Sequence, residues 1–146
     1  MVGQHWRIAA ARPGERHIGG LRVEDTASPQ AMWPAFFNGL PLARYPEVVE
    51  ASVQEVGSGL NAVGVTFPSD LDEFDLAQRE PIPADSVEIY CQSFPEEVMP
   101  RTVFYQVLLA LGEQLVQRPG QPGEWYTASR AALQKLRAKM GLVGYK

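Results

Sequence analysis

Two hydrophobic periods follow one another along this chain, and their order is what most constrains its fold. Before residue 92, short segments alternate apolar and polar side chains with the period of two that β-strands show. Between residues 101 and 117 the period becomes that of a helix, and the apolar stripe consists of Phe104, Val107, Leu108, Leu111 and Leu115. Strands that come before helices, instead of alternating with them, indicate an α+β fold with a mainly antiparallel sheet.

The alternating segments predict a sheet of about five strands. We expect these strands at residues 6–10, 18–23, 49–54, 62–67 and 87–92. The third and fourth form the clearest hairpin, over residues 47–67. In it, Val49, Ala51 and Val53 share one face of the first strand, and Gly57–Gly59 turns the chain.

Three helices are predicted beside the sheet. A short one in the N-terminal half begins with Ser28 as its N-cap and Pro29 in its first turn, and it ends near Gly39. The two others lie at the C-terminal end, one over residues 101–117 and one that Thr127 is expected to cap. The length of 146 residues fits a single globular domain over residues 1–146.

The sequence favours a cytoplasmic protein. No apolar run follows a basic start, so no secretory signal is predicted. The only cysteine is Cys91, which excludes an internal disulfide. The longest apolar run, Val107–Leu111, is far shorter than the roughly 20 residues that cross a bilayer, so we expect no membrane contact.

Charge is distributed unevenly along the chain, although the net charge is only −4. Residues 47–97 contain twelve acidic residues and one basic residue, whereas residues 118–146 contain six basic residues and one acidic residue. This asymmetry predicts an acidic face and a basic face. An acidic face repels nucleic acid and attracts basic proteins, mainly by speeding association. The alternative is that these charges only solvate the surface.

None of the motifs predicts a catalytic residue, a cofactor or a metal site. The run from Gly57 to Ala62 matches the dinucleotide-binding pattern, but β-forming residues follow it where a helix would have to begin. The acidic run from Asp70 to Asp75 lacks the later ligands of a calcium loop. Two histidines and one cysteine are too few for a zinc site without carboxylates. Cys91 alternates in phase with Val87 and Ile89, which predicts a buried thiol and not a nucleophile.

The middle of the chain resembles the small immunity proteins of bacterial polymorphic-toxin and contact-dependent growth inhibition systems. The resemblance covers about residues 60–117 and follows a hairpin, an acidic loop, a strand and an amphipathic helix. The residues that carry it are Phe67-Pro68-Ser69-Asp70, Phe74-Asp75, Pro83, Val87-Glu88-Ile89-Tyr90, Glu96-Glu97-Val98 and Phe104-Tyr105-Gln106-Val107-Leu108-Leu109.

This resemblance implies a partner and a contact surface. The partner is a cognate toxin C-terminal domain, for which a basic nuclease is the expected type, and the immunity protein blocks it with an acidic surface. Asp70, Asp72, Glu73 and Asp75 are the expected steering and contact cluster, Phe74 is the expected anchor, and Glu88 and Tyr90 lie beside it on the outer face of the strand. The two aromatic residues could equally pack into a minor core under the loop.

Two other functions stay open at this point. One is a secretion chaperone or adaptor, which would bind an unfolded or effector segment. The other is a small α+β enzyme or small-molecule-binding protein, which requires a concave pocket with convergent polar groups. Acid pairs such as Glu96 and Glu97 keep a carboxylate-based enzyme within this second alternative.

Overall fold

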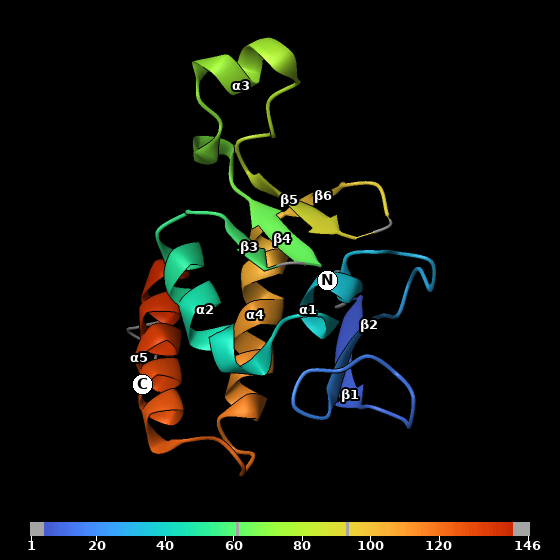
Figure 1. Cartoon of the computed structure of the whole chain (residues 1–146), viewed down its shortest axis with the longest axis vertical. Coiled ribbons are helices and arrows are strands. Elements are labelled where there is room, and N and C mark those ends of the chain that lie inside the picture. The colour runs from blue at the N-terminus through green and yellow to red at the C-terminus, as the bar shows by residue number, and fades with distance from the viewer. Residues whose placement is uncertain (1–4, 61, 93, 142–146) are drawn as a thin grey trace.

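The computed structural model describes residues 5–60, 62–92 and 94–141, and over these residues the chain has the predicted α+β fold. Figure 1 shows α4 at the centre, α2 and α5 side by side, and the strands in two separate groups. The elements are β1 (Trp6–Ala10), β2 (Leu21–Asp25), α1 (Pro34–Asn38), the 3₁₀ turn η1 (Leu42–Arg44), α2 (Tyr45–Val53), β3 (Ser58–Leu60), β4 (Val63–Thr66), the 3₁₀ turn η2 (Pro68–Asp70), α3 (Glu73–Gln78), β5 (Ser86–Cys91), β6 (Glu97–Pro100), α4 (Arg101–Leu115) and α5 (Gly123–Lys139).

The strands form two antiparallel sheets, so the prediction of one sheet of about five strands was wrong. β1 pairs with β2 alone, and the second sheet has the order β3-β4-β5-β6. Asn38 explains the separation. Its side-chain amide accepts a hydrogen bond from the backbone N–H of Val23 and donates one to the Val23 carbonyl, at 2.8 and 2.9 Å. These are the β2 backbone groups that another strand would need for pairing.

The predicted hairpin over residues 47–67 was wrong in its first half. Residues Tyr45–Val53 form the helix α2, because Tyr45, Val48, Val49 and Ser52 make a buried stripe with helical spacing. The alternation of Val49, Ala51 and Val53 was too short to distinguish the two periods. The hairpin is confined to β3 and β4, and Ser58 and Gly59 lie within β3 instead of forming its turn.

Two helices begin at other residues than predicted. The helix expected from Ser28 is reduced to α1, which begins at Pro34, because the Asp25 carboxylate accepts the backbone N–H of Ser28 and holds this segment in a turn. The last helix begins at Gly123, one turn before Thr127, and this extra turn buries Trp125. The strand β6 was not predicted at all.

The helix α4 confirms the strongest prediction. All five residues of its apolar stripe are buried in one hydrophobic cluster with residues from β2, α1, α2, α5 and the four-stranded sheet. No helix in the described part of the chain combines the length and apolar character of a bilayer-spanning segment.

Tertiary packing brings the acidic and basic segments of the chain together, which corrects the expectation of separate faces. On α5, Lys135 lies 3.0 Å from Glu50 and Lys139 lies 2.9 Å from Glu55. Arg101 also approaches Glu55, at 3.5 Å. Glu50 of α2 and Glu55, which follows α2, are therefore both paired with basic side chains. The acidic residues without an ion-pair partner lie in another part of the molecule.

One of these ion pairs makes stability depend on pH. The hydrogen bond from Lys139 lowers the pKa of Glu55 below its usual value of 4.5, against an opposing effect of partial burial. A carboxyl with a lowered pKa in the folded state adds stability above its unfolded-state pKa, and this stability is lost as the pH falls through the folded-state pKa. We expect Glu55→Gln to lower the urea midpoint at about pH 7 and to lower it less at about pH 3.

The matched control for this prediction is Glu80→Gln, because Glu80 is exposed, lies outside the helices and has no ion-pair partner among the described residues. Its effect on the urea midpoint should be the same at both pH values. If Glu55→Gln lowered the urea midpoint equally at both pH values, ionisation of Glu55 would not contribute to the pH dependence of stability.

Candidate functional site

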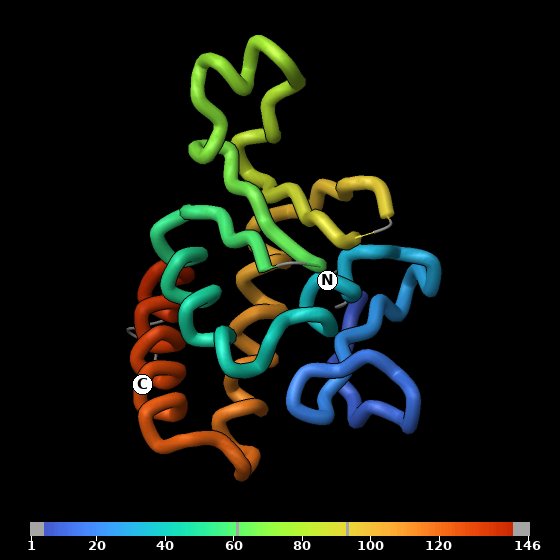
Figure 2. The backbone as a smooth tube through the Cα atoms, in the orientation of Figure 1, coloured from blue at the N-terminus to red at the C-terminus, as the bar shows by residue number. Residues whose placement is uncertain are grey.

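Residues 68–85 form a projection, here called the acidic arm, between β4 and β5. It contains η2, α3 and an extended return to β5. Figures 1 and 2 show the arm at one end of the long axis, standing away from the sheet and the other helices. It contains six acidic residues and one basic residue, and no residue of α3 is buried. The arm is the strongest concentration of unpaired acidic residues in the described chain.

The first attachment of the arm is the Asp70 carboxylate. Its two oxygens accept hydrogen bonds from the backbone N–H groups of Phe67, at 2.7 Å, and Gly57, at 3.2 Å. A Cβ on residue 57 would lie 2.6 Å from the Val65 carbonyl oxygen and 2.7 Å from this carboxylate, so glycine is required there. Asp70 was predicted as a contact residue, and the structure places it at the base of the arm as a structural acceptor.

The second attachment lies where the arm returns to β5. Arg79 donates two hydrogen bonds of 2.9 Å to the two carboxylate oxygens of Glu88. The Arg101 side chain donates one of 2.9 Å to the Ala84 carbonyl, and the backbone N–H of Arg101 donates one of 2.8 Å to the Asp85 carbonyl. The arm is therefore fixed at both ends. Glu88, which was predicted as a contact residue, has its charge neutralised by Arg79.

The tip of the arm is a capped turn of helix that presents charge and an aromatic ring. Asp72 caps α3 by accepting the backbone N–H of Asp75 at 2.9 Å, and the Asp75 carboxylate accepts the backbone N–H of Asp72 at 3.1 Å. The first of these bonds lowers the pKa of Asp72, so this carboxyl stays ionised. Between the two capping residues, the side chain of Phe74 is 72% exposed. The structure thus decides against a core position for this ring.

A second exposed group lies on the outer face of the four-stranded sheet. Tyr90 is 41% exposed, and its neighbour across the ladder is Gly64, which adds no side chain to that face. Val98 is 47% exposed and stands opposite Glu88. Glu88 connects this face to the arm through Arg79. Four of the predicted contact residues, Asp72, Glu73, Phe74 and Asp75, therefore share the tip, while Tyr90 belongs to the sheet face.

Sequence reasoning missed two exposed apolar residues of this region. Leu76, on α3, is 45% exposed, and Val98 is on the strand that was not predicted. The signal for Leu76 was its position one turn after Asp72 and next to Asp75, in a segment with too few apolar residues to bury a face. Val98 belongs to the run Glu96-Glu97-Val98 that carries the resemblance, but nothing in the sequence indicated that its side chain is exposed.

Other chemistry finds little support in the described residues. Cys91 is buried as predicted, and burial followed by the charge of Glu97 raises the pKa of its thiol. Within the described ranges, no three histidine, cysteine or acidic side chains are grouped so that they could hold a metal ion. Gly57 directly precedes β3 and Gly59 lies within it, and the next element is the strand β4. No helix therefore begins there whose N-terminus could bind a pyrophosphate.

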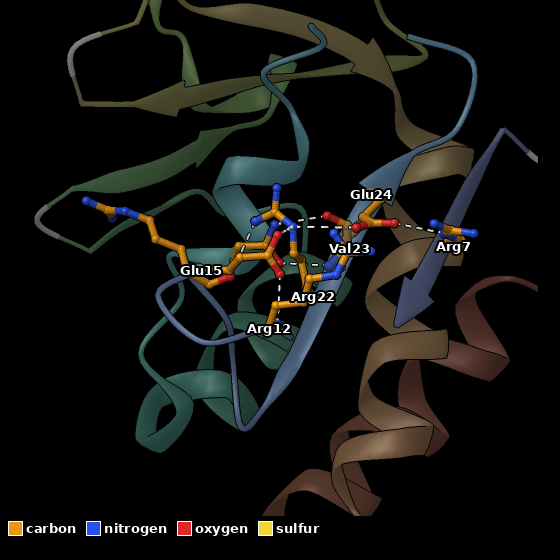
Figure 3. A network of polar contacts seen from close by, with 8 residues as sticks. Arg7, Arg12, Glu15, Arg22, Val23 and Glu24 are labelled. Atoms are coloured by element: carbon orange, nitrogen blue, oxygen red, sulfur yellow. Dashed lines mark hydrogen bonds and ion pairs between the residues drawn. The ribbon is translucent and has the colours of Figure 1, made fainter. Parts of the chain in front are cut away.

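A concave pocket of about 580 Å³ lies apart from the arm, between β2, residues 26–35 and α1. Three arginines line it, and polar contacts connect two of them to Glu24, as Figure 3 shows. A pocket of this kind is what the small-molecule alternative requires.

No family model, curated protein or solved structure matches the chain.

Proposed function

We propose that this protein is a cytoplasmic immunity protein, which binds a cognate bacterial toxin domain with a basic surface and neutralises it through the acidic arm. The observation that carries the proposal is the exposed Phe74 ring, set between carboxylates on an arm that is fixed at both ends.

An exposed aromatic ring is costly in water unless a partner covers it. A side chain of this size that is 72% exposed contributes little to folding, because most of it stays in water. Aromatic residues are enriched at the centres of protein interfaces, where a pocket of the partner removes them from water. Phe74 therefore suits a docking anchor better than any residue of the core.

Preorganisation supports the same conclusion. A flexible loop loses conformational freedom when it binds, and this loss weakens affinity. The bonds of Asp70, Arg79 and Arg101 hold the arm before any partner arrives. The capping box of Asp72 and Asp75 likewise fixes the first turn of α3, which carries Phe74.

The charge of the arm indicates the chemistry of the partner. The carboxylates of Glu73 and Glu80 are exposed and have no ion-pair partner among the described residues. A basic surface would neutralise these charges and would be steered toward the arm from a distance, so that association is fast at low salt. A nuclease domain has such a surface because it binds phosphates.

The test begins with isolation of the partner by the tagged protein from its native cells in moderate salt, with mass spectrometry of the bound protein. We expect a basic domain in nearly equal amount, which stops the growth of a bacterial host and is neutralised by co-expression of this protein. The arm variant combines Asp72→Asn, Glu73→Gln, Asp75→Asn and Glu80→Gln. Asp70 is left intact because it holds the arm, and asparagine still caps a helix at position 72.

The arm variant should associate roughly tenfold more slowly at low salt and show a flatter salt dependence. Phe74→Ala should instead raise the dissociation rate. A control of equal charge combines Glu47→Gln, Glu50→Gln, Glu113→Gln and Glu124→Gln, away from the arm, and should bind like the wild type. Equal binding and neutralisation by the arm variant would exclude the arm as the interface, and a bound protein without toxicity would exclude an immunity function.

A further inference from the structure

The pocket near the N-terminus is built from segments that are rigidly connected. Its walls come from β2, from the connection to α1 and from α1 itself, while Phe94 reaches it from the connection between β5 and β6. Asn38 bonds to both backbone groups of Val23 and thereby fixes α1 against β2. The volume of about 580 Å³ lies within the range of about 300–1,000 Å³ that small-molecule sites occupy.

Three arginines from separate segments converge on this pocket. They are Arg7 on β1, Arg16 in the hairpin connection and Arg22 on β2. Figure 3 shows Arg7 and Arg22 on either side of Glu24, with Glu15 next to Arg22. Arg7 Nε donates a hydrogen bond of 2.8 Å to Glu24, whereas Arg22 Nε lies 3.6 Å from both Glu15 and Glu24.

The N–H donors of this cluster exceed its acceptors. Arg22 Nε is enclosed between the carboxylates of Glu15 and Glu24 without a hydrogen bond to either, and Arg22 Nη1 donates a hydrogen bond of 3.4 Å to the Arg16 carbonyl. The Arg16 guanidinium also has no carboxylate partner among the residues that the structure describes. The Asp25 carboxylate also lines the pocket, but it already accepts hydrogen bonds from the backbone of Ser28 and from Trp33 Nε1, each at 2.8 Å.

Arg22 Nη2 and the guanidinium of Arg16 have no hydrogen-bond acceptor among the described residues, so their N–H groups are available to a ligand in the pocket. Guanidinium groups match the oxygens of phosphate and carboxylate, which they bind through paired, charge-assisted hydrogen bonds. The lining also includes large apolar side chains, those of Met32 and Phe94.

We propose that this pocket binds a small molecule that carries an oxyanion, either a phosphate or a carboxylate, together with an apolar group. The oxyanion accepts hydrogen bonds from Arg22 and Arg16, and the apolar group packs against Met32 and Phe94. This site is independent of the proposed function of the arm, because α3 and the β1–β2 hairpin lie toward opposite ends of the long axis (Figure 1).

Titration with three probes at constant ionic strength tests the proposal: inorganic phosphate, phenyl phosphate and benzoate. The readout is the NMR signal of the arginine side-chain Nε–H groups, with chloride as the reference anion. We expect saturable shifts of the Arg22 and Arg16 signals, and tighter binding of phenyl phosphate than of inorganic phosphate because its ring is removed from water. The comparison of phenyl phosphate with benzoate decides between a phosphate and a carboxylate.

Two variants make the result specific to this site. Arg16→Gln removes an exposed guanidinium without an acid partner, so the fold should be retained, and it should weaken binding about tenfold. Arg22→Gln should weaken binding at least as much. Arg44→Gln is the control, because Arg44 pairs with Glu47 outside the pocket. Absence of saturation with all three probes, or equal binding by Arg16→Gln and the wild type, would overturn the proposal without affecting the role of the arm.

Discussion

Phe104→Ala is expected to lower the free energy of unfolding by about 3–5 kcal/mol, the range for removing a fully buried phenylalanine. Phe104 is 0% exposed and lies where α4 meets α1 and the four-stranded sheet. Its ring centre is 5.7 Å from that of Phe36, 5.5 Å from that of Phe37 and 6.1 Å from that of Phe67. Because two of these neighbours lie on α1 and the third follows β4, the cavity that alanine leaves is difficult to close.

The measurement is urea unfolding followed by tryptophan fluorescence and far-UV circular dichroism. A small domain is stable by only about 5–15 kcal/mol in total, so the variant should be close to its unfolding transition in water. The control is Phe74→Ala, which removes the same ring from the exposed tip of the arm and should change stability by less than about 0.5 kcal/mol. Similar losses for the two variants would contradict the assignment of Phe74 to the surface.

Gly112→Val is the second substitution with a large expected effect. Gly112 lies on α4 where Tyr45 of α2 and Leu133 of α5 pack against it. A Cβ at residue 112 would overlap the Tyr45 hydroxyl and would lie 2.6 Å from Leu133 Cδ2. The Tyr45 hydroxyl is buried and donates a hydrogen bond of 2.5 Å to the Leu108 carbonyl, so it is held in place. We expect a loss of about 3 kcal/mol, the upper part of the range for overpacking.

A double-mutant cycle with Tyr45→Phe identifies the cause of this loss. Tyr45→Phe removes the hydroxyl and should by itself cost about 1 kcal/mol for the hydrogen bond. In that background Gly112→Val should cost less than in the wild type, with a coupling of at least about 0.5 kcal/mol. Gly123→Val is the steric control, since a Cβ there meets nothing within 4 Å. Strict additivity would contradict a clash between residues 45 and 112.

The elements predicted correctly are those whose signal is long or repeated. The helix α4 extends over fifteen residues, so its apolar stripe is repeated through four turns and has no other explanation. β5 alternates over six residues and is buried on one face, and this was also predicted. For α2, three alternating residues were consistent with a strand as well as with a helix, and contact of its apolar stripe with α4 and α5 decided between them.

The sequence predicted which segment forms the candidate site, but not the role of each residue in it. The sequence marked the segment from Asp70 to Asp75 as acidic and Phe74 as a candidate anchor. It could not show that the Asp70 carboxylate accepts a hydrogen bond from the backbone N–H of Gly57. The two residues are thirteen positions apart, and only the folded path of the chain between them brings them together. The pocket was missed for the same reason, since its three arginines come from separate segments that converge only in the folded chain.

The sequence by itself determined the α+β class, the central helix and the surplus of acidic residues in the middle of the chain, because periodicity and composition are properties of the chain alone. Tertiary structure alone decided which of those acids stay unpaired. Lys135 and Lys139 meet Glu50 and Glu55 because α5 packs along α2, whereas the arm extends beyond the reach of α5. Ion pairing depends on distances of a few ångströms, and only the packing of helices and sheets sets distances of that size between remote residues.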